Sequence, residues 1–180
     1  MARNRRDWRV ESSGLPGYNA AMASENKGFA VELSLNGLGE TQALGERIAA
    51  GLGVGDAVAL EGDLGAGKTT LARAILQALG VGEDVPSPSF TLVQHYEMER
   101  LTVHHYDFYR IERPREIDEL GLDEALDEGA ALIEWPERAP DRIPADALYI
   151  SLTVSGDTAR HASIRGPARW SAFFKAAHAV

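Results

Sequence analysis

The sequence predicts an α/β fold with a mostly parallel central sheet, antiparallel strands at its edge and flanking helices. Short apolar segments at residues 57–61 and 130–135 are typical of strands buried in a parallel sheet. Segments with apolar side chains at helical spacing lie before and after the first of them. The chain has 180 residues, of which 44% are hydrophobic, so we expect one domain with its own core.

The first half of the predicted domain alternates strands and helices. Residues 29–35 alternate between apolar and polar side chains like a strand, and residues 39–51 have apolar side chains at helical spacing before a pair of glycines. The buried strand 57–61 leads into a glycine-rich loop. A helix is predicted over residues 69–79, because apolar residues line one of its faces and Gly80 follows it.

The second half is predicted to be richer in strands. Two strands are expected at residues 89–96 and 101–106, and short helices in the acidic stretch 114–128. The apolar strand 130–135 follows. The final predicted elements are a hairpin of strands 148–154 and 159–164, and an amphipathic helix containing Trp170, Phe173, Phe174 and Ala177.

Residues 1–28 are predicted to be a disordered extension, and residues 29–180 the folded domain. The extension has no apolar periodicity. It contains five basic and three acidic side chains, so it carries +2 of a net charge of −9, and the remainder carries −11. Because an acidic body repels a phosphate backbone, we expect no DNA binding and no direct binding of RNA by this body.

Composition also limits the chemistry and the location. There are no cysteines, which excludes disulfides, thiolate metal sites and a cysteine nucleophile. The apolar segments have the length of strands and are too short to cross a bilayer. Four arginines occur in residues 1–10, but the apolar stretch of a secretory signal does not follow them. We therefore expect a cytoplasmic protein without membrane contact.

The loop between the strand 57–61 and the next helix has the pattern G-x-x-x-x-G-K-T. Glycines allow a sharp turn and a close approach to phosphate, while successive backbone N–H groups and the helix N-terminus form an anion cradle. The strand–loop–helix context predicts a P-loop that binds ATP with Mg²⁺. The residues predicted to bind the nucleotide are Asp63, Leu64, Gly65, Ala66, Gly67, Lys68, Thr69 and Thr70.

Three side chains of this loop have distinct predicted roles. Lys68 would reach the β- and γ-phosphates, the Thr69 hydroxyl would bind Mg²⁺, and Thr70 would lie near the α-phosphate. A P-loop also needs a carboxylate at the end of a neighbouring strand, and both Asp107 and Glu134 qualify. Glu134 ends the cleaner apolar strand, whereas the polar and aromatic residues before Asp107 are more typical of an exposed or antiparallel strand. The residues alone leave this choice open.

Two other patterns are weaker. His104, His105 and Asp107 have metal-ligand spacing, but only the last two share a strand face and no third ligand is apparent, which disfavours a zinc site. Residues 118–121 match the D-x-x-G string of GTPases. No apolar strand precedes that string and the sequence has no N-K-x-D string, which disfavours specificity for GTP.

Five ordered pieces of the sequence together resemble one family, the bacterial ATPases of tRNA threonylcarbamoyladenosine biosynthesis (TsaE). The pieces are residues 62–70, 87–93, 105–110, 119–122 and 133–137. The resemblance runs from about residue 29 to residue 164. It implies an ATPase that is slow alone and works in a complex with the threonylcarbamoyl transferase and its partner subunit, which would hold the tRNA.

The resemblance also implies roles for individual residues. Glu134 would be the direct Mg²⁺ ligand beside Thr69, and Asp107 an essential polar residue near the γ-phosphate. Residues 87–90 resemble a mobile switch loop beside the site, and Ser89 stands where the family often has threonine. Serine keeps the hydroxyl that would position water or sense phosphate. Lys68, Ser89, Asp107 and Glu134 are thus the predicted catalytic residues.

Other details of the resemblance concern the edge of the site. Trp135 would sit beside it, and Thr41 matches, weakly, a family position near the nucleotide. The sequence shows no obvious arginine finger. Arg110 is a candidate, although a surface or ion-pair role is the simpler interpretation.

Two rival functions share the same loop. A small-molecule kinase would need an acceptor pocket and usually an arginine-bearing lid, and the sequence shows neither clearly. A non-catalytic, nucleotide-gated binding module would use ATP only to set its shape. Phosphate transfer to an added metabolite would favour the kinase, and steady phosphate release from the purified complex would count against the module.

Overall fold

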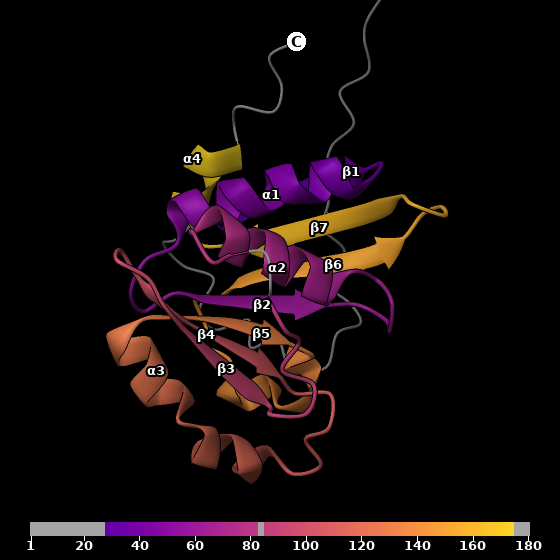
Figure 1. The fold of residues 1–180 in the computed structure, drawn as a ribbon. Coiled ribbons are helices and arrows are strands. Elements are labelled where there is room, and N and C mark those ends of the chain that lie inside the picture. The colour runs from indigo at the N-terminus through magenta and orange to yellow at the C-terminus, as the bar shows by residue number, and fades with distance from the viewer. Residues whose placement is uncertain (1–27, 83–84, 175–180) are drawn as a thin grey trace, which may run out of the picture.

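The computed structural model describes residues 28–82 and 85–174, with a seven-stranded sheet at the centre (Figure 1). The strands are β1 (Phe29–Leu35), β2 (Ala57–Glu61), β3 (Val93–Glu97), β4 (Thr102–Asp107), β5 (Ala130–Glu134), β6 (Leu148–Val154) and β7 (Arg160–Gly166). Of the predicted extension, only Gly28 is described, so its disorder stays a prediction. Ala177 of the predicted closing helix also lies outside the described residues.

The strands follow the order β1-β7-β6-β2-β5-β4-β3 across the sheet. The central strands β6, β2, β5 and β4 are parallel to one another. The antiparallel pairs lie on the outside, where β3 pairs with β4 at one edge and β1 and β7 follow β6 at the other. The predicted fold class is confirmed, with one extension: antiparallel strands close both edges of the sheet.

Helices cover both faces of this sheet. The α-helices are α1 (Leu38–Gly51), α2 (Lys68–Ala78), α3 (Leu122–Glu128) and α4 (Ser171–Phe174). The 3₁₀ helices are Pro114–Leu120, Pro136–Arg138, Pro140–Arg142 and Ala168–Trp170. Figure 1 shows α1 and α2 side by side on one face and α3 on the other. No helix in residues 28–82 and 85–174 is both long and apolar enough to cross a membrane.

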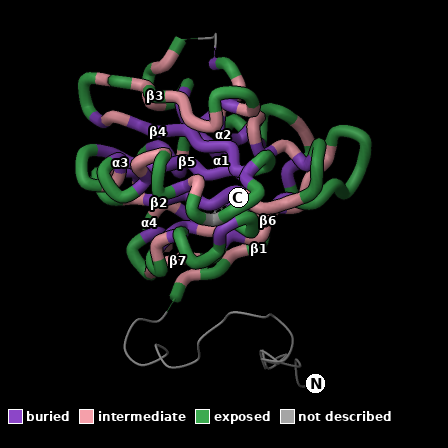
Figure 2. Tube along the Cα trace, turned by 90° about the horizontal axis from the view of Figure 1, so that it is seen from below, coloured by how far each residue is buried: buried purple, intermediate pink, exposed green. Residues whose placement is uncertain are grey.

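The sheet has a core on each face, because its central strands are apolar on both sides. Val58 and Leu60 of β2 face the core under α1, α2 and α4, while Ala57 and Ala59 face the core under α3. Figure 2 shows the buried tracts along these central strands. Burial on both faces explains why the apolar runs of β2 and β5 do not alternate in sequence.

Helix α1 packs closely against α2, the helix that follows the glycine-rich loop, and so fixes its position. A Cβ added at Gly45 of α1 would lie 2.7 Å from the Cβ of Ala74 in α2, so only glycine permits this approach. Both helices agree with the sequence prediction to within one residue at each end. The short helices predicted in the acidic stretch 114–128 are also observed.

Two sequence predictions about strands were only partly right. The strand predicted from residue 89 begins only at Val93, because residues 88–91 form a turn and Leu92 has a φ of 64°, which interrupts an extended chain. The strand before Asp107 is also not exposed, since residues 103–107 are all buried. It is antiparallel only toward β3, and its other neighbour β5 is parallel.

Candidate nucleotide-binding site

The loop between β2 and α2 is a tight backbone cradle. Gly62, Gly65 and Gly67 have φ values of 135°, 81° and 108°, a region that other L-residues rarely adopt. A Cβ at Gly62 would also lie 2.3 Å from the carbonyl oxygen of Leu152 in β6. Gly62 is therefore required both for its conformation and for contact with the next strand.

Lys68 is the first residue of α2, and its side chain curls back over the loop. Its Nζ donates to the carbonyl oxygens of Gly62 at 2.6 Å and Asp63 at 2.9 Å. On the other side, Nζ lies 3.6 Å from the centroid of the Trp135 ring. Burial lowers the pKa of Lys68 below its ordinary value, while Glu134 foremost among the nearby carboxylates acts in the opposite direction.

Trp135 is held beside the loop in an uncommon conformation. Its φ of 61° and ψ of 48° are left-handed, which costs a bulky residue energy and is found most often at functional sites. The backbone N–H of Trp135 donates to Leu60 O of β2 at 3.2 Å, and its ring centroid lies 4.8 Å from that of Tyr109. Trp135 thus lies against Lys68, beside the loop.

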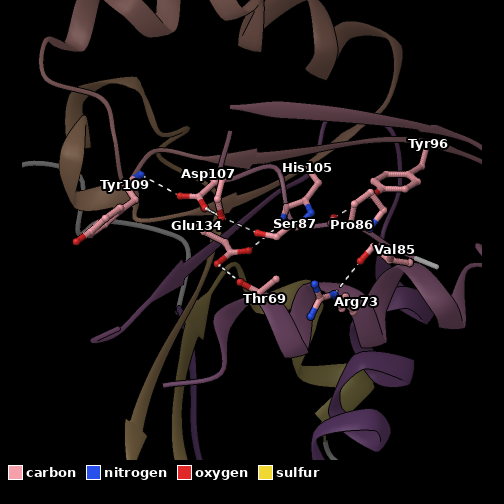
Figure 3. Close-up of polar contacts among 11 residues, drawn as sticks. Thr69, Arg73, Val85, Pro86, Ser87, Tyr96, His105, Asp107, Tyr109 and Glu134 are labelled. Carbon is pink, nitrogen blue, oxygen red and sulfur yellow. Dashed lines mark hydrogen bonds and ion pairs between the residues drawn. The ribbon is translucent and has the colours of Figure 1, made fainter. Parts of the chain in front are cut away.

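Glu134 and Asp107 lie directly opposite each other at the ends of the neighbouring parallel strands β5 and β4. Both are buried, with 2% and 5% of their surface exposed. The Thr69 hydroxyl donates to Glu134 Oε2 at 2.8 Å (Figure 3). The structure thus brings Glu134 to the side chain that is predicted to hold Mg²⁺.

Asp107 has a different set of partners. Its Oδ2 accepts a hydrogen bond from the Ser89 hydroxyl at 2.9 Å, and its Oδ1 accepts one from the backbone N–H of Tyr109 at 3.0 Å. The hydroxyl oxygens of Ser87 and Ser89 lie 2.7 Å apart. Glu134 therefore faces the P-loop, whereas Asp107 holds the segment that resembles a switch loop.

The residues present fit a magnesium ion. A hydroxyl and a carboxylate are hard oxygen donors, and Mg²⁺ in nucleotide sites uses one or two such ligands together with phosphates and water. No group of three or more histidine, aspartate and glutamate side chains in the described part of the chain is placed to hold a metal ion.

Thr41 lies on the opposite side of the loop, in a cavity of about 280 Å³. The cavity is lined by α1, by the loop residues Gly67 and Thr70, and by the β6–β7 hairpin with Asp157 and Arg160. Arg160 Nε donates to the carbonyl oxygen of Ala66 at 3.0 Å, which connects the hairpin to the P-loop. The hollow is thus continuous with the phosphate cradle.

Two residues in this site were not predicted for it. Arg160 lies far along the chain from the loop that it contacts, so only the hairpin's position in the sheet reveals it. His105 was considered as a zinc ligand, but its Nε2 lies 2.9 Å from Glu134 Oε1. The shared strand face of His105 and Asp107 was the available signal, and the register with β5 was needed to use it.

Two candidates lie away from the loop. The guanidinium of Arg110 stacks over the ring of Phe90, 4.5 Å from its centroid, and Phe90 is 82% exposed. Asp118 of the D-x-x-G string forms an exposed ion pair with Arg142. Neither contact involves the P-loop.

Comparison with known proteins gives one consistent result. A family model described as threonylcarbamoyl adenosine biosynthesis protein TsaE matches residues 35–162. A relative from Rickettsia felis, named tRNA threonylcarbamoyladenosine biosynthesis protein TsaE, is 40% identical over 133 residues, covering 73% of this chain and 78% of the relative. A Bacillus subtilis relative of the same name is 39% identical over 122 residues, covering 67% and 76%. The crystal structure of Bacillus subtilis YdiB matches with a TM-score of 0.69 at 29% identity, covering 84% and 96%.

Proposed function

Because this chain belongs to the threonylcarbamoyl adenosine biosynthesis protein TsaE family, we propose that it is a slow, Mg²⁺-dependent ATPase that supports threonylcarbamoyladenosine modification of tRNA. The observation that carries the proposal is the contact of Thr69 with Glu134 at the mouth of a complete P-loop. A loop that served only as a turn would not need a buried carboxylate beside its threonine.

The geometry supports one orientation of the nucleotide. The loop amides and the N-terminus of α2 would bind the β- and γ-phosphates, and Lys68 would exchange its two carbonyl partners for phosphate oxygens. Thr70 would lie near the α-phosphate. The cavity that contains Thr41 and Asp157 would then take the sugar and base, because it continues from the loop on that side.

The opposite end of the cradle would carry out hydrolysis. Thr69 and Glu134 would hold Mg²⁺, which when bound supplies positive charge to the phosphate oxygens. Ser89 donates a hydrogen bond to Asp107 and then accepts one from the Ser87 hydroxyl, so one lone pair of its oxygen remains available to accept a hydrogen bond from a water. Asp107 and Ser89 would thereby orient the water that attacks the γ-phosphorus, while Lys68 and the loop amides stabilise the developing charge.

The partners in this proposal are the threonylcarbamoyl transferase and its partner subunit. With a net charge of −9, the chain is poorly suited to hold tRNA, so the tRNA would be bound by the partners and reached only indirectly. The exposed Phe90 in residues 85–92, next to Ser89, lies where a partner could sense the site.

The test is to measure ATP binding with Mg²⁺ or with a chelator, and phosphate release by the chain alone and with the two partners. We expect Mg²⁺-enhanced binding, weak release alone and a clear gain in the complex. Absence of ATP binding would overturn the proposal. Phosphate transfer to a metabolite without free phosphate would indicate a kinase, and binding without any release in the complex would indicate a nucleotide-gated module.

A further inference from the structure

Two consecutive histidines of β4 lie on opposite faces of the sheet. His104 points toward Tyr106 and the α3 side, where its Nδ1 lies 2.7 Å from Nδ1 of the exposed His95. His105 points to the α1–α2 side and is fully buried. The same strand therefore supplies one histidine to the nucleotide site and one to a place outside it.

Among the residues that the structure describes, the His105 side chain has one polar contact. Val103 precedes it on the same face, and its register partner Leu132 in β5 also belongs to the apolar core under α1 and α2. Its Nε2 lies 2.9 Å from Glu134 Oε1, and its Nδ1 has no hydrogen-bond partner among the described residues. Leaving a buried polar atom unpaired costs about 1–3 kcal/mol, so an apolar residue would be the better choice for packing alone.

Glu134 is in turn held from both sides (Figure 3). Because a carboxylate only accepts hydrogen bonds, the imidazole N–H at Nε2 donates to Oε1 while the Thr69 hydroxyl donates to Oε2. The two donors come from different elements, β4 and α2. With Oε1 engaged, the carboxylate cannot rotate freely, and Oε2 stays directed at Thr69.

From this arrangement we propose that His105 is a positioning residue for Mg²⁺, holding the Glu134 carboxylate so that Oε2 faces the cation site beside Thr69. The inference rests on the proposed function, since it assumes that Mg²⁺ binds there with ATP. Hydrogen-bond partners of metal-binding carboxylates orient the ligand, and their loss lowers metal affinity about 10–100-fold. The nucleotide contacts proposed for the loop amides and Lys68 would not involve His105.

The test compares His105→Gln with His105→Asn and His105→Leu. A glutamine amide can place an N–H near the position of Nε2, whereas the asparagine amide is one methylene shorter and leucine has no donor. For each variant, ATP affinity is measured by calorimetry in EDTA and at increasing Mg²⁺. Thermal unfolding without nucleotide checks that each variant folds. His104→Leu is the matched control, because it removes the adjacent imidazole on the face away from the site.

We expect His105→Leu and His105→Asn to raise the Mg²⁺ concentration for half-maximal enhancement about 10-fold or more, with the affinity in EDTA unchanged. His105→Gln should stay within about 3-fold of the unmodified protein, and His104→Leu should match it. If leucine fails to fold, the glutamine–asparagine pair decides alone.

The inference is overturned if the unmodified protein shows Mg²⁺ enhancement and the folded His105 variants all retain it, or if glutamine and asparagine behave alike. If the unmodified protein binds ATP with no enhancement by Mg²⁺, the proposed Mg²⁺ dependence fails, and this inference fails with it. The two failures are therefore distinguishable by the behaviour of the unmodified chain.

Discussion

Two segments enclose the candidate site, and they are held in different ways. The loop of residues 62–67 joins a buried strand to a packed helix, and its shape follows from its glycines and from the core beneath it. Val85 at the start of the segment 85–92 and Leu92 at its end pack in the two cores, and hydrogen bonds of individual side chains also hold the segment. These include Ser89 to Asp107 at 2.9 Å and Arg73 Nε to the carbonyl oxygen of Val85 at 2.8 Å (Figure 3).

The difference indicates a division of labour. The first wall of the site, residues 62–67, is built from backbone and core, so it can hold phosphate without changing shape, which favours tight binding. The second wall, residues 85–92, is held by hydroxyl–carboxylate contacts, so it can be rearranged when phosphate and Mg²⁺ compete for the same carboxylates. Hence we expect changes in residues 62–68 to act on stability and affinity, and changes in residues 85–92 to act on the response to partners.

The largest effect should follow from Gly62→Ala, which changes the first residue of the rigid first wall. The added Cβ would lie 2.3 Å from the Leu152 carbonyl oxygen, and the backbone at residue 62 has a conformation that favours glycine. We therefore expect the free energy of unfolding to fall by about 3–5 kcal/mol. Gly65→Ala is the control, because it also has a positive φ but nothing within 4 Å, and should cost about 1–2 kcal/mol. Urea unfolding without nucleotide measures both. Equal losses would show that conformation alone matters.

Lys68→Ala should leave the protein folded and lower ATP affinity about 100-fold, since charge-assisted hydrogen bonds contribute roughly 1.5–3 kcal/mol each. Arg73→Ala removes a cation from the same helix that contacts Val85 of the other wall, so its affinity should change less than about 3-fold. Calorimetric titration with ATP checks both variants. An unchanged affinity in Lys68→Ala would remove the loop from the site.

The two carboxylates give the next effect, because Glu134 contacts Thr69, just after the loop of residues 62–67, and Asp107 contacts Ser89 of the segment 85–92. Glu134→Ala should abolish the enhancement of ATP binding by Mg²⁺, a change of at least about 10-fold. Asp107→Ala should keep most of that enhancement but lose hydrolysis. Titrations with and without Mg²⁺, paired with phosphate-release assays, separate the two outcomes. The reverse pattern would exchange the roles that their contacts with Thr69 and Ser89 suggest.

The sequence predicted the first wall much better than the second. Strand β2 and helix α2 are local, strongly patterned elements joined by a glycine-rich loop, so their bounds were predicted to within one residue. Residues 89–91 of the turn 88–91 were predicted as part of a strand, because the Ser-Phe-Thr-Leu sequence at 89–92 has high strand propensity and nothing local indicates the positive φ of Leu92. Contacts with the distant strand β4 therefore override the local strand propensity of this segment.

The same reasoning explains what was missed in the site. The polar residues of β4 suggested exposure, yet His105 and Asp107 are buried, with Glu134 as the polar partner of His105 and with Ser89 and the backbone of Tyr109 as those of Asp107. Which of two carboxylates meets Thr69 depends on strand order, and strand order is a property of the whole sheet. Residue types and spacing identified the candidates, and only the three-dimensional arrangement could pair them.

The smallest and most selective effect should come from Ser89→Ala in the second wall. Its hydroxyl contacts Asp107 and Ser87 but no atom of the P-loop, so ATP affinity should change less than about 3-fold. Stimulation of hydrolysis by the transferase partners should nevertheless fall several-fold, because a partner would recognise residues 85–92 only in the arrangement that Ser89 holds. Prolines at positions 86 and 88 restrict that segment to few conformations, so losing one contact shifts its population rather than unfolding it.

Ser87→Ala, which keeps the bond to Asp107, is the control and should retain most of the stimulation. Phosphate release with increasing partner concentration measures both variants. Fast hydrolysis by the isolated chain, insensitive to partners and to Ser89→Ala, would show that both walls are rigid and that the comparison between them is wrong.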